Sequence, residues 1–319
     1  MKEAVSTSDV GSAPAFLESS EAALAADPLQ EGWRAQAWLT LRRADQAAGT
    51  VHQGGATAPL KWQRGFPQDG GRLLLPLLHT AGGLVGGDDL TVRLRLEAGA
   101  AGLITSVAAQ KVYGSVGRSR LVPEGRWARQ HLLVDLDRGA DLEWFPQELV
   151  LFRGGLFEQH TRVQLAPGAS WLGAEVVRLG RTADGEALDL GAWRSSLDIR
   201  RESAWEFVDR LALGPETLES EHGLAHQPVV GSLVWAAPEA VPDSLIVRAR
   251  AAAVGLEGAM ACGRLERGLV ARYRGPSSQA ARFWFCRIWA LIRDHRGLPS
   301  PELPRVWPFQ EDPLAAWSG

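Results

Sequence analysis

The sequence predicts a mainly β protein that adds two α-helices only in its C-terminal third. Strand patterns follow one another from about residue 33 to residue 236, no helical segment lies between them, and two helical patterns follow after residue 242. This order excludes a doubly wound α/β fold and favours a sandwich, a barrel or a solenoid. No fixed sequence repeat marks a regular solenoid.

The chain opens on a segment, residues 1–30, that is rich in Ala, Ser and Glu and has no sustained apolar period. Such a segment predicts a mobile leader, followed by a single β-rich domain over residues 31–319. The leader lacks the basic stretch and the unbroken apolar segment of a secretory signal. The sequence therefore predicts a cytoplasmic protein.

The segment LTVRLRLEAG shows the strand pattern clearly, because apolar and polar residues alternate along it as in a strand with one buried face. The predicted inward residues are Leu90, Val92, Leu94 and Leu96. Comparable runs follow along the chain: GLITSV, RQHLLVDLD, DLEWF, ELVLFRGG, HTRVQLAPGA, AEVVRLG, SSLDIRR, EFVDRLALG and VVGSLVWA. Together they predict a large system of sheets.

Two helices are predicted near the C-terminus. The first begins after Pro242, with Asp243 or Ser244 as its N-cap, and the second begins at the N-cap Ser277 and ends near Gly297. The second has a broad apolar stripe that predicts docking on the sheets, with basic residues near the negative end of its dipole. A strand, GLVARYRG, separates the two helices, and the proline-rich tail LPSPELPRVWPF predicts a segment that lies on the surface.

The composition excludes several classes of partner and site. A net charge of -3 gives no general attraction to nucleic acid or to an anionic membrane, and no apolar run is long enough to cross a bilayer. The two cysteines, Cys262 and Cys286, provide neither a disulfide framework nor a paired CxxC spacing, and we expect buried free thiols. Thirteen tryptophans predict a generous core or a protein interface.

The segment LLHTAGGLVGGDDL, residues 77–90, is the most unusual stretch of the chain. Its glycines do not fit GxGxxG, and Asp88 and Asp89 stand where a phosphate-binding loop requires lysine and a hydroxyl residue. Carboxylates at these positions would repel phosphate. We therefore interpret the glycines, Gly82, Gly83, Gly86 and Gly87, as positions that need positive φ or close backbone approach before a strand.

Other candidate sites have equally ordinary explanations. His222 and His226 have the spacing of metal ligands on a helix, but Gly223 and Pro228 argue against that helix. Lys111 and Tyr113 share one face of an apparent strand, where they can pack rather than act as an acid/base pair. No GxSxG motif or activated cysteine points to nucleophilic catalysis.

The stretch HTAGGLVGGDDLTVRLRLEAGAAGLITSVAAQKVYGS closely resembles the most characteristic region of the urease accessory proteins called UreD, or UreH in some organisms. The segments DLEWFPQELVLFRGG and WALIRDHRGLPSPELPRVWPF resemble two further regions of that family, so the resemblance covers about residues 33–310. Ser106 and Gln110 depart from the family pattern, which has threonines near Lys111.

The resemblance implies a non-enzymatic maturation factor with no tightly bound cofactor. UreD proteins bind apo-urease and, with UreF and the GTPase UreG, form a complex that inserts nickel into the urease active site at the expense of GTP. The implied fold is an irregular β-helix-like stack of sheets with two α-helices in the C-terminal third. The family also implies an internal passage for nickel, which requires weak, exchangeable oxygen or nitrogen ligands.

Within the matched segments, four residues are our candidates for a transient nickel passage: Asp88, Asp89, Glu148 and His79. A second set carries the family pattern and is assigned a structural role: Gly82, Gly83, Gly86, Gly87, Lys111, Tyr113, Arg305 and Trp307. Two alternatives remain open at this point. A β-fold enzyme predicts a pocket with convergent polar groups and a strongly perturbed titrating residue, whereas a β-solenoid binding module predicts binding to an extended ligand without nickel dependence.

Overall fold

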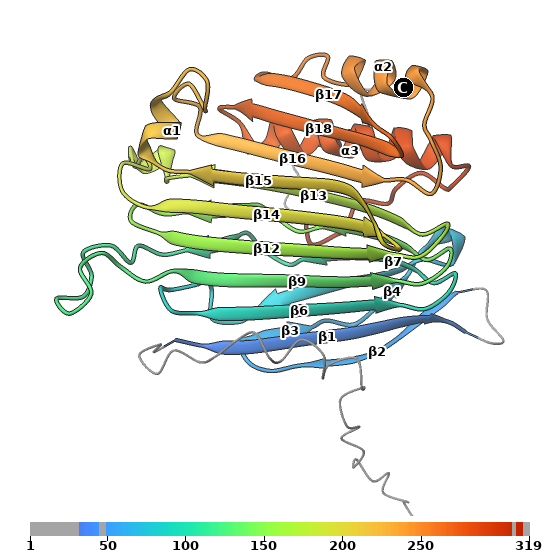
Figure 1. Cartoon of the computed structure of the whole chain (residues 1–319), viewed down its shortest axis with the longest axis horizontal. Helices are drawn as coiled ribbons and strands as arrows, with labels where there is room; N and C mark the ends of the chain where they lie inside the picture. Colours follow the sequence, from blue (N-terminus) through green and yellow to red (C-terminus); the bar gives the residue numbers. More distant parts are fainter. Residues whose placement is uncertain (1–31, 45–48, 308–310, 315–319) are drawn as a thin grey trace, which may run out of the picture. The chain divides into compact units, whose positions relative to one another are not determined.

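The computed structural model describes residues 32–44, 49–307 and 311–314, all within the unit Gly32–Gly319. The predicted leader, residues 1–30, lies outside the described residues. The described part of the chain forms two large sheets and three α-helices (Figure 1). None of these helices is both long and apolar enough to cross a membrane.

The first sheet, sheet A, has seven strands in the order β15-β14-β12-β9-β6-β1-β2. Its strands are β1 (Arg34–Arg43), β2 (Thr50–Ala56), β6 (Asp89–Leu96), β9 (Ala128–Leu136), β12 (Leu156–Leu165), β14 (Ala192–Arg201) and β15 (Ala204–Leu213). The five strands β1, β6, β9, β12 and β14 run parallel to one another, and antiparallel strands close both edges.

The second sheet, sheet B, has eleven strands, eight of them in the order β17-β18-β16-β13-β10-β7-β5-β3. These are β3 (Leu60–Trp62), β5 (Leu73–His79), β7 (Ala101–Ser106), β10 (Asp141–Phe145), β13 (Ser170–Leu179), β16 (Val229–Ala236), β17 (Ala259–Leu265) and β18 (Gly268–Gly275). Three short strands join this path at its side: β4 (Phe66–Pro67), β8 (Gln110–Val112) and β11 (Leu149–Leu151).

Between β5 and β14 the chain winds back and forth between the two sheets. It passes from β6 in sheet A to β7 in sheet B, from β9 to β10 and from β12 to β13, and each strand pairs in parallel with its counterpart from the previous turn. Figure 1 shows the resulting rungs of sheet A stacked above one another. This winding confirms the β-helix-like stack of sheets, which the antiparallel edge strands make irregular.

The turns of this winding share a short local sequence that does not recur at a fixed period. Each passage from sheet A to sheet B has the pattern Leu-x-x-Gly-Ala, at LEAGA, LDRGA and LAPGA. Gly99, Gly139 and Gly168 adopt φ values of 68°, 65° and 74°, a conformation that favours glycine. Successive corners stack, since the Gly139 amide donates to Pro167 and the Gly99 amide to Arg138. The repeat has no fixed period because loops of different length separate the corners.

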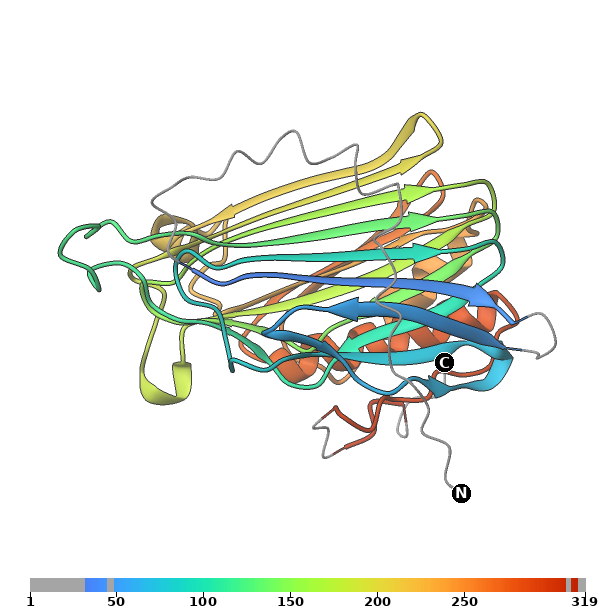
Figure 2. The ribbon, with the colours of Figure 1, turned by 90° about the horizontal axis from the view of Figure 1, so that it is seen from below.

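Two hydrophobic cores lie on the two faces of sheet B. One fills the space between the sheets and includes Leu90, Val92, Leu94 and Leu96, as the alternation predicted. The other lies between sheet B and the helices, with α2 (Asp243–Ala251) and α3 (Ser278–His295) on the face away from sheet A (Figure 2). Sheet B is therefore buried on both sides, whereas none of the described helices covers the other face of sheet A.

The predicted helices are confirmed, with differences at their ends. The Ser277 side chain caps α3 by accepting a hydrogen bond of 3.1 Å from the Ala280 amide. The predicted N-cap of α2 is wrong: Pro242 occupies that position and provides no side-chain hydrogen bond. A short helix, α1 (Pro215–Glu219), and two 3₁₀ turns, η3 (Asp69–Gly71) and η4 (Thr182–Asp184), were not predicted.

The prediction that the C-terminal tail lies on the surface is wrong for Trp307. This indole is buried, and its Nε1 donates to Thr105 Oγ1 at 2.7 Å. Its ring also lies against those of Phe145 and Trp289, at 6.3 and 6.2 Å between centroids. Proline excludes a segment from helices and central strands, but it does not prevent a tryptophan within that segment from anchoring in a core. Arg305, two residues earlier, is exposed.

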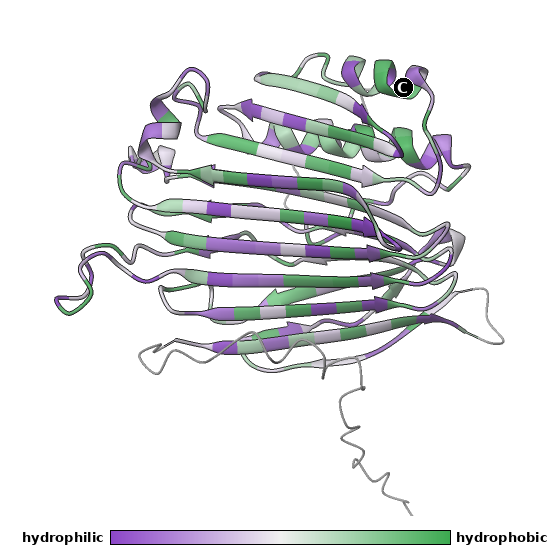
Figure 3. Ribbon diagram, viewed as in Figure 1, coloured by the Kyte–Doolittle hydropathy of each residue, from purple (hydrophilic) through white to green (hydrophobic). Residues whose placement is uncertain are grey.

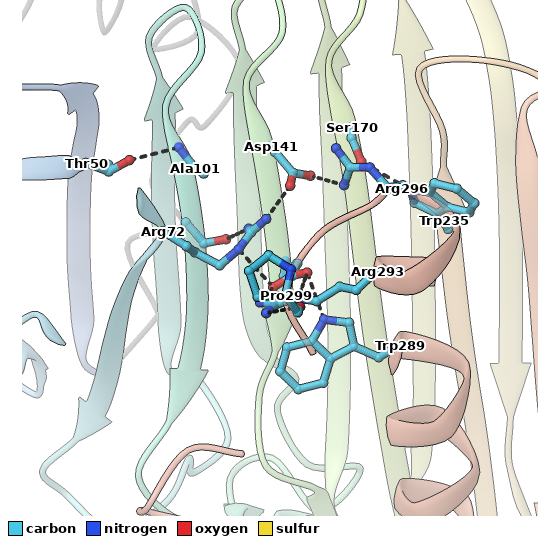
Figure 4. Close-up of polar contacts among 12 residues, drawn as sticks. Thr50, Arg72, Ala101, Asp141, Ser170, Trp235, Trp289, Arg293, Arg296 and Pro299 are labelled. Atoms are coloured by element: carbon cyan, nitrogen blue, oxygen red, sulfur yellow. Dashed lines mark hydrogen bonds and ion pairs between the residues drawn. The ribbon is translucent and has the colours of Figure 1, made fainter. Parts of the chain in front are cut away.

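A buried ionic network joins α3 to sheet B (Figure 4). Glu143 on β10 accepts hydrogen bonds from Trp289 Nε1 at 2.8 Å and from both Nε and Nη2 of Arg293, at 2.8 and 2.6 Å. Asp141 on the same strand accepts from Arg72 and, at 2.8 Å, from Arg296. The basic end of α3 thus pairs with buried carboxylates of the sheet, in addition to any interaction with the helix dipole.

Candidate functional site

A cavity of about 440 Å³ lies between sheets A and B. Its lining extends across the strands of sheet B from His79 on β5 to Arg272 on β18. These two strands are separated by five inter-strand spacings, or about 24 Å. The cavity therefore runs at right angles to the strands, through the space where a closely packed core would otherwise lie.

Polar side chains occupy inward positions of sheet A along the cavity. Gln130 on β9, Gln159 on β12 and Ser195 on β14 are direct cross-strand neighbours, so they form one continuous row. Thr161 and Asp209 belong to the next row of the same wall. Because inward positions of a sandwich are normally apolar, this band interrupts the core and leaves room for water or another small polar species.

Sheet B contributes a matching row of Glu175 on β13, Ser232 on β16 and Arg272 on β18. Arg272 bridges the two walls: Nη2 pairs with Asp209 of sheet A at 2.6 Å, and Nη1 donates to Ser232 Oγ at 2.9 Å. The cavity thus contains two carboxylates, of which Asp209 is neutralised by an arginine.

The pKa of Glu175 is raised to about 7, mainly by burial and to a smaller extent by the nearby Asp209 carboxylate. A hydrogen bond from Gln159 and the positive charge of Arg272 act in the opposite direction. Glu175 points into the cavity, so part of its surface is accessible to water although the group lies deep between the sheets. Near neutral pH this carboxyl is thus divided between its neutral and charged forms.

We expect Glu175→Gln to change how stability depends on pH. Wild-type Glu175 has a raised pKa, so between about pH 5 and 7 the folded protein keeps a proton that the unfolded chain has lost. Wild-type stability should therefore fall as the pH rises, by up to about 1.4 kcal/mol per pH unit over that range. In urea unfolding at pH 5 and pH 8, the free energy of unfolding of the variant relative to that of the wild type should be higher at pH 8 than at pH 5. An equal difference at both pH values would contradict the raised pKa.

His79, one of the four predicted nickel residues, lies at the other end of the cavity. Burial lowers the pKa of its imidazole, although the negative charge of Asp88 acts in the opposite direction. The lowered pKa favours the neutral imidazole, which is the form that can bind a metal. Both ring nitrogens are buried and have no hydrogen-bond partner among the described residues. Such a group is suited to accept a ligand or water from the cavity.

The other three predicted nickel residues lie elsewhere. Asp88 is buried, and its two oxygens each accept a backbone amide, from Trp33 and Val85, at 2.9 Å. Asp89 lies on the outer face of sheet A, where Oδ1 is 3.9 Å from Nε2 of His131. Glu148 pairs with Arg282 at 2.7 Å. None of the three carboxylates lines the cavity, and their role in nickel transfer stays a prediction.

The glycines of residues 77–90 have backbone reasons for their identity. Gly82 and Gly87 adopt φ values of 76° and 101°. A Cβ on Gly83 would lie 2.7 Å from the Tyr113 ring and 2.8 Å from the carbonyl oxygen of Lys111, and one on Gly86 would lie 2.2 Å from Ser115 Oγ. The TAGG-GGD and KVY segments thus pack directly against each other, beside the His79 end of the cavity.

No group of three or more His, Cys, Asp or Glu side chains in 32–44, 49–307 and 311–314 is arranged to hold a metal ion. The pair His222 and His226 is exposed and lies in turns after α1 rather than on one helix face. The donors around the cavity are separate oxygen and nitrogen groups, which can bind a cation weakly and release it.

Sequence reasoning missed Glu175, Asp209 and Arg272. A pattern for the first was present: in WLGAEVVRL, Glu175 stands in the same phase as Trp171, Val177 and Leu179, which are inward. Gln130 and Gln159 likewise interrupt the apolar phase of their strands. Several polar residues in inward phase indicate a polar interior, but the alternation alone does not show that they face one another.

The comparisons with known proteins agree with the resemblance of the sequence motifs to the UreD family. The profile of the UreD urease accessory proteins matches residues 34–308. The urease accessory protein UreD of Synechococcus sp. strain WH7805 is 57% identical over 279 residues, covering 84% of this chain and 87% of that protein. UreD of Prochlorococcus marinus strain MIT 9313 is 58% identical over 275 residues, covering 84% and 86%. The chain therefore belongs to the family of UreD urease accessory proteins.

Proposed function

We propose that this chain is a cytoplasmic urease maturation factor without catalytic activity of its own. It binds apo-urease, recruits UreF and the GTPase UreG, and supports the GTP-dependent insertion of nickel into the urease active site. Nickel moves through the cavity between sheets A and B. Membership of the UreD family supports the accessory role, and the cavity is the observation that supports the passage.

The chemistry of the lining supports transit of a cation rather than storage. Transfer requires ligands that bind weakly and exchange, whereas a closed thiolate site would hold the metal. The lining offers the His79 imidazole, the carboxylates of Glu175 and Asp209, and a series of amide and hydroxyl oxygens. Both cysteines are buried, and burial raises their pKa, for Cys262 to about 11 and for Cys286 to about 12, so neither is a thiolate at neutral pH.

The cavity also meets both criteria for the enzyme alternative, because polar groups converge in it and Glu175 has a raised pKa. Geometry alone therefore does not separate a passage from an active site. The family favours the passage, since its members are named as accessory proteins of another enzyme. The two functions make different predictions for the isolated chain, which turns over a substrate only if the cavity is an active site.

Reconstitution tests the proposed function directly. Apo-urease, UreF, UreG, nickel and GTP are combined with and without this chain, and ammonia release and urease-bound nickel are measured. We expect activation only when both the chain and GTP are present. Equal activation without the chain would refute the proposal, and GTP hydrolysis by the purified chain alone would refute the division of labour with UreG.

A further inference from the structure

The outer face of sheet A carries an unusual concentration of arginine. Outward positions of β1, β6, β9, β12, β14 and β15 alternate with the buried ones, and Figure 3 shows the hydrophilic residues recurring along these strands. Nine arginines occupy outward positions, and we call this surface the arginine face: Arg34, Arg42, Arg93, Arg95, Arg129, Arg162, Arg194, Arg200 and Arg210.

The arginine face is positive although the chain as a whole is not. Its outward strand positions hold only four carboxylates, those of Asp89, Asp135, Glu158 and Asp198. A fifth carboxylate, Asp137 directly after β9, pairs with Arg95 at 3.0 Å, so the arginines remain in excess. The chain as a whole carries a net charge of -3, so positive charge is concentrated here and negative charge lies elsewhere. A fixed excess of one sign on a flat surface attracts a partner of the opposite sign.

Several of these arginines are available to a partner. Arg34 and Arg162 are exposed and form no ion pair with any described residue. Arg129 pairs with Glu158 at 3.2 Å and Arg210 with Asp198 at 2.6 Å, but these pairs are exposed enough for a partner carboxylate to join them.

Aromatic residues flank the arginines at both sides of the face. Trp38 on β1 is 38% exposed and Trp205 on β15 is 55% exposed, and the guanidinium of Arg200 lies 4.2 Å from the Trp205 ring centroid. Arginine and tryptophan are among the residue types that most often carry the binding energy of protein interfaces. An exposed tryptophan is also costly to leave in water, which favours an interface over a merely solvated surface.

We propose that the arginine face binds the urease apoprotein through an acidic surface of that partner. The six strands, about 4.8 Å apart, and about 20 Å of strand length give roughly 500 Å² before side chains extend it, against about 800 Å² per partner in a standard interface. No described helix or strand covers this face, whereas α2 and α3 cover sheet B. The inference rests on the proposed function, since it assigns a surface to one of its partners.

The test measures the affinity of the full chain for purified apo-urease by biolayer interferometry at several salt concentrations. The variant Arg34→Glu/Arg162→Glu reverses two exposed charges of the face. The control Arg64→Glu/Arg267→Glu makes the same change of net charge at two exposed arginines outside it. We expect the face variant to raise Kd at least tenfold at physiological salt and to reduce the salt dependence, while the control stays within twofold of the wild type.

Equal affinities of the two double variants would overturn the assignment of this face while leaving the proposed function intact. Absence of wild-type binding to apo-urease would instead refute the proposed function and this inference with it. Thermal unfolding of each variant identifies a loss of binding that comes from unfolding. The single variant Arg162→Gln, which removes charge without reversing it, should then show a smaller loss in the same direction.

Discussion

Asp209→Asn is expected to reduce urease activation in the reconstituted system at least tenfold. In the wild type this carboxylate neutralises Arg272 inside the cavity, at 2.6 Å. Without it the guanidinium remains as an unopposed positive charge in the proposed nickel passage. A divalent cation about 6 Å away is then repelled by roughly 5 kcal/mol at an effective dielectric constant of about 20, far more than the 1.4 kcal/mol of a tenfold effect.

The double variant Asp209→Asn/Arg272→Met separates electrostatics from structural damage. It removes both charges of the pair, so activation should recover toward the wild-type level although two residues are changed. Ser232→Ala removes a hydroxyl partner of Arg272 without changing the charge and serves as the matched control. If the single and double variants lose activation equally, or if neither loses it, the charge of this cavity does not govern nickel transfer.

Glu143→Gln is expected to lower the free energy of unfolding by about 3–5 kcal/mol, the usual cost of breaking a buried ion pair. The Glu143 carboxylate holds Trp289 and Arg293 of α3 and lies 3.4 Å from Nε of Arg72. The neutral amide would leave two buried guanidinium groups with too little negative charge, and its NH₂ group would face donors instead of accepting from them. Urea unfolding followed by tryptophan fluorescence measures the loss.

Asp294→Asn provides the comparison on the same helix. Asp294 pairs with Arg248 at 3.1 Å, but the two side chains are 66% and 44% exposed. Water screens such a pair, and its loss should change stability by less than about 1 kcal/mol. A similar loss for Glu143→Gln would show that the network in Figure 4 contributes no more than a surface ion pair.

Local patterns predicted most of the strands from β6 onward and the principal helix correctly, because each depends on residues close in sequence, whereas β17 was not predicted. The alternation of Leu90, Val92, Leu94 and Leu96 predicted a strand with one buried face, and Ser277 predicted the start of α3. The prediction misplaced the N-cap of α2, which is Pro242. Backbone amides at a helix start have no partner within the helix, so proline, which lacks an amide hydrogen, is tolerated there in place of a polar cap. The Leu-x-x-Gly-Ala corners escaped notice because unequal loops hide their period.

The sequence by itself determined the class of the fold, the family, and the reason for the glycines of residues 77–90, since periodicity, motifs and backbone requirements are properties of neighbouring residues. Only the tertiary structure decided which polar groups share a site. His79, Glu175, Asp209 and Arg272 come from four strands of two sheets, and the winding of the chain brings them to one cavity. The tertiary structure also decided that Asp88 accepts hydrogen bonds from backbone amides and that Asp89 lies on the outer face of sheet A. A strand pattern shows that a residue faces inward, whereas the register between distant strands decides what it meets there.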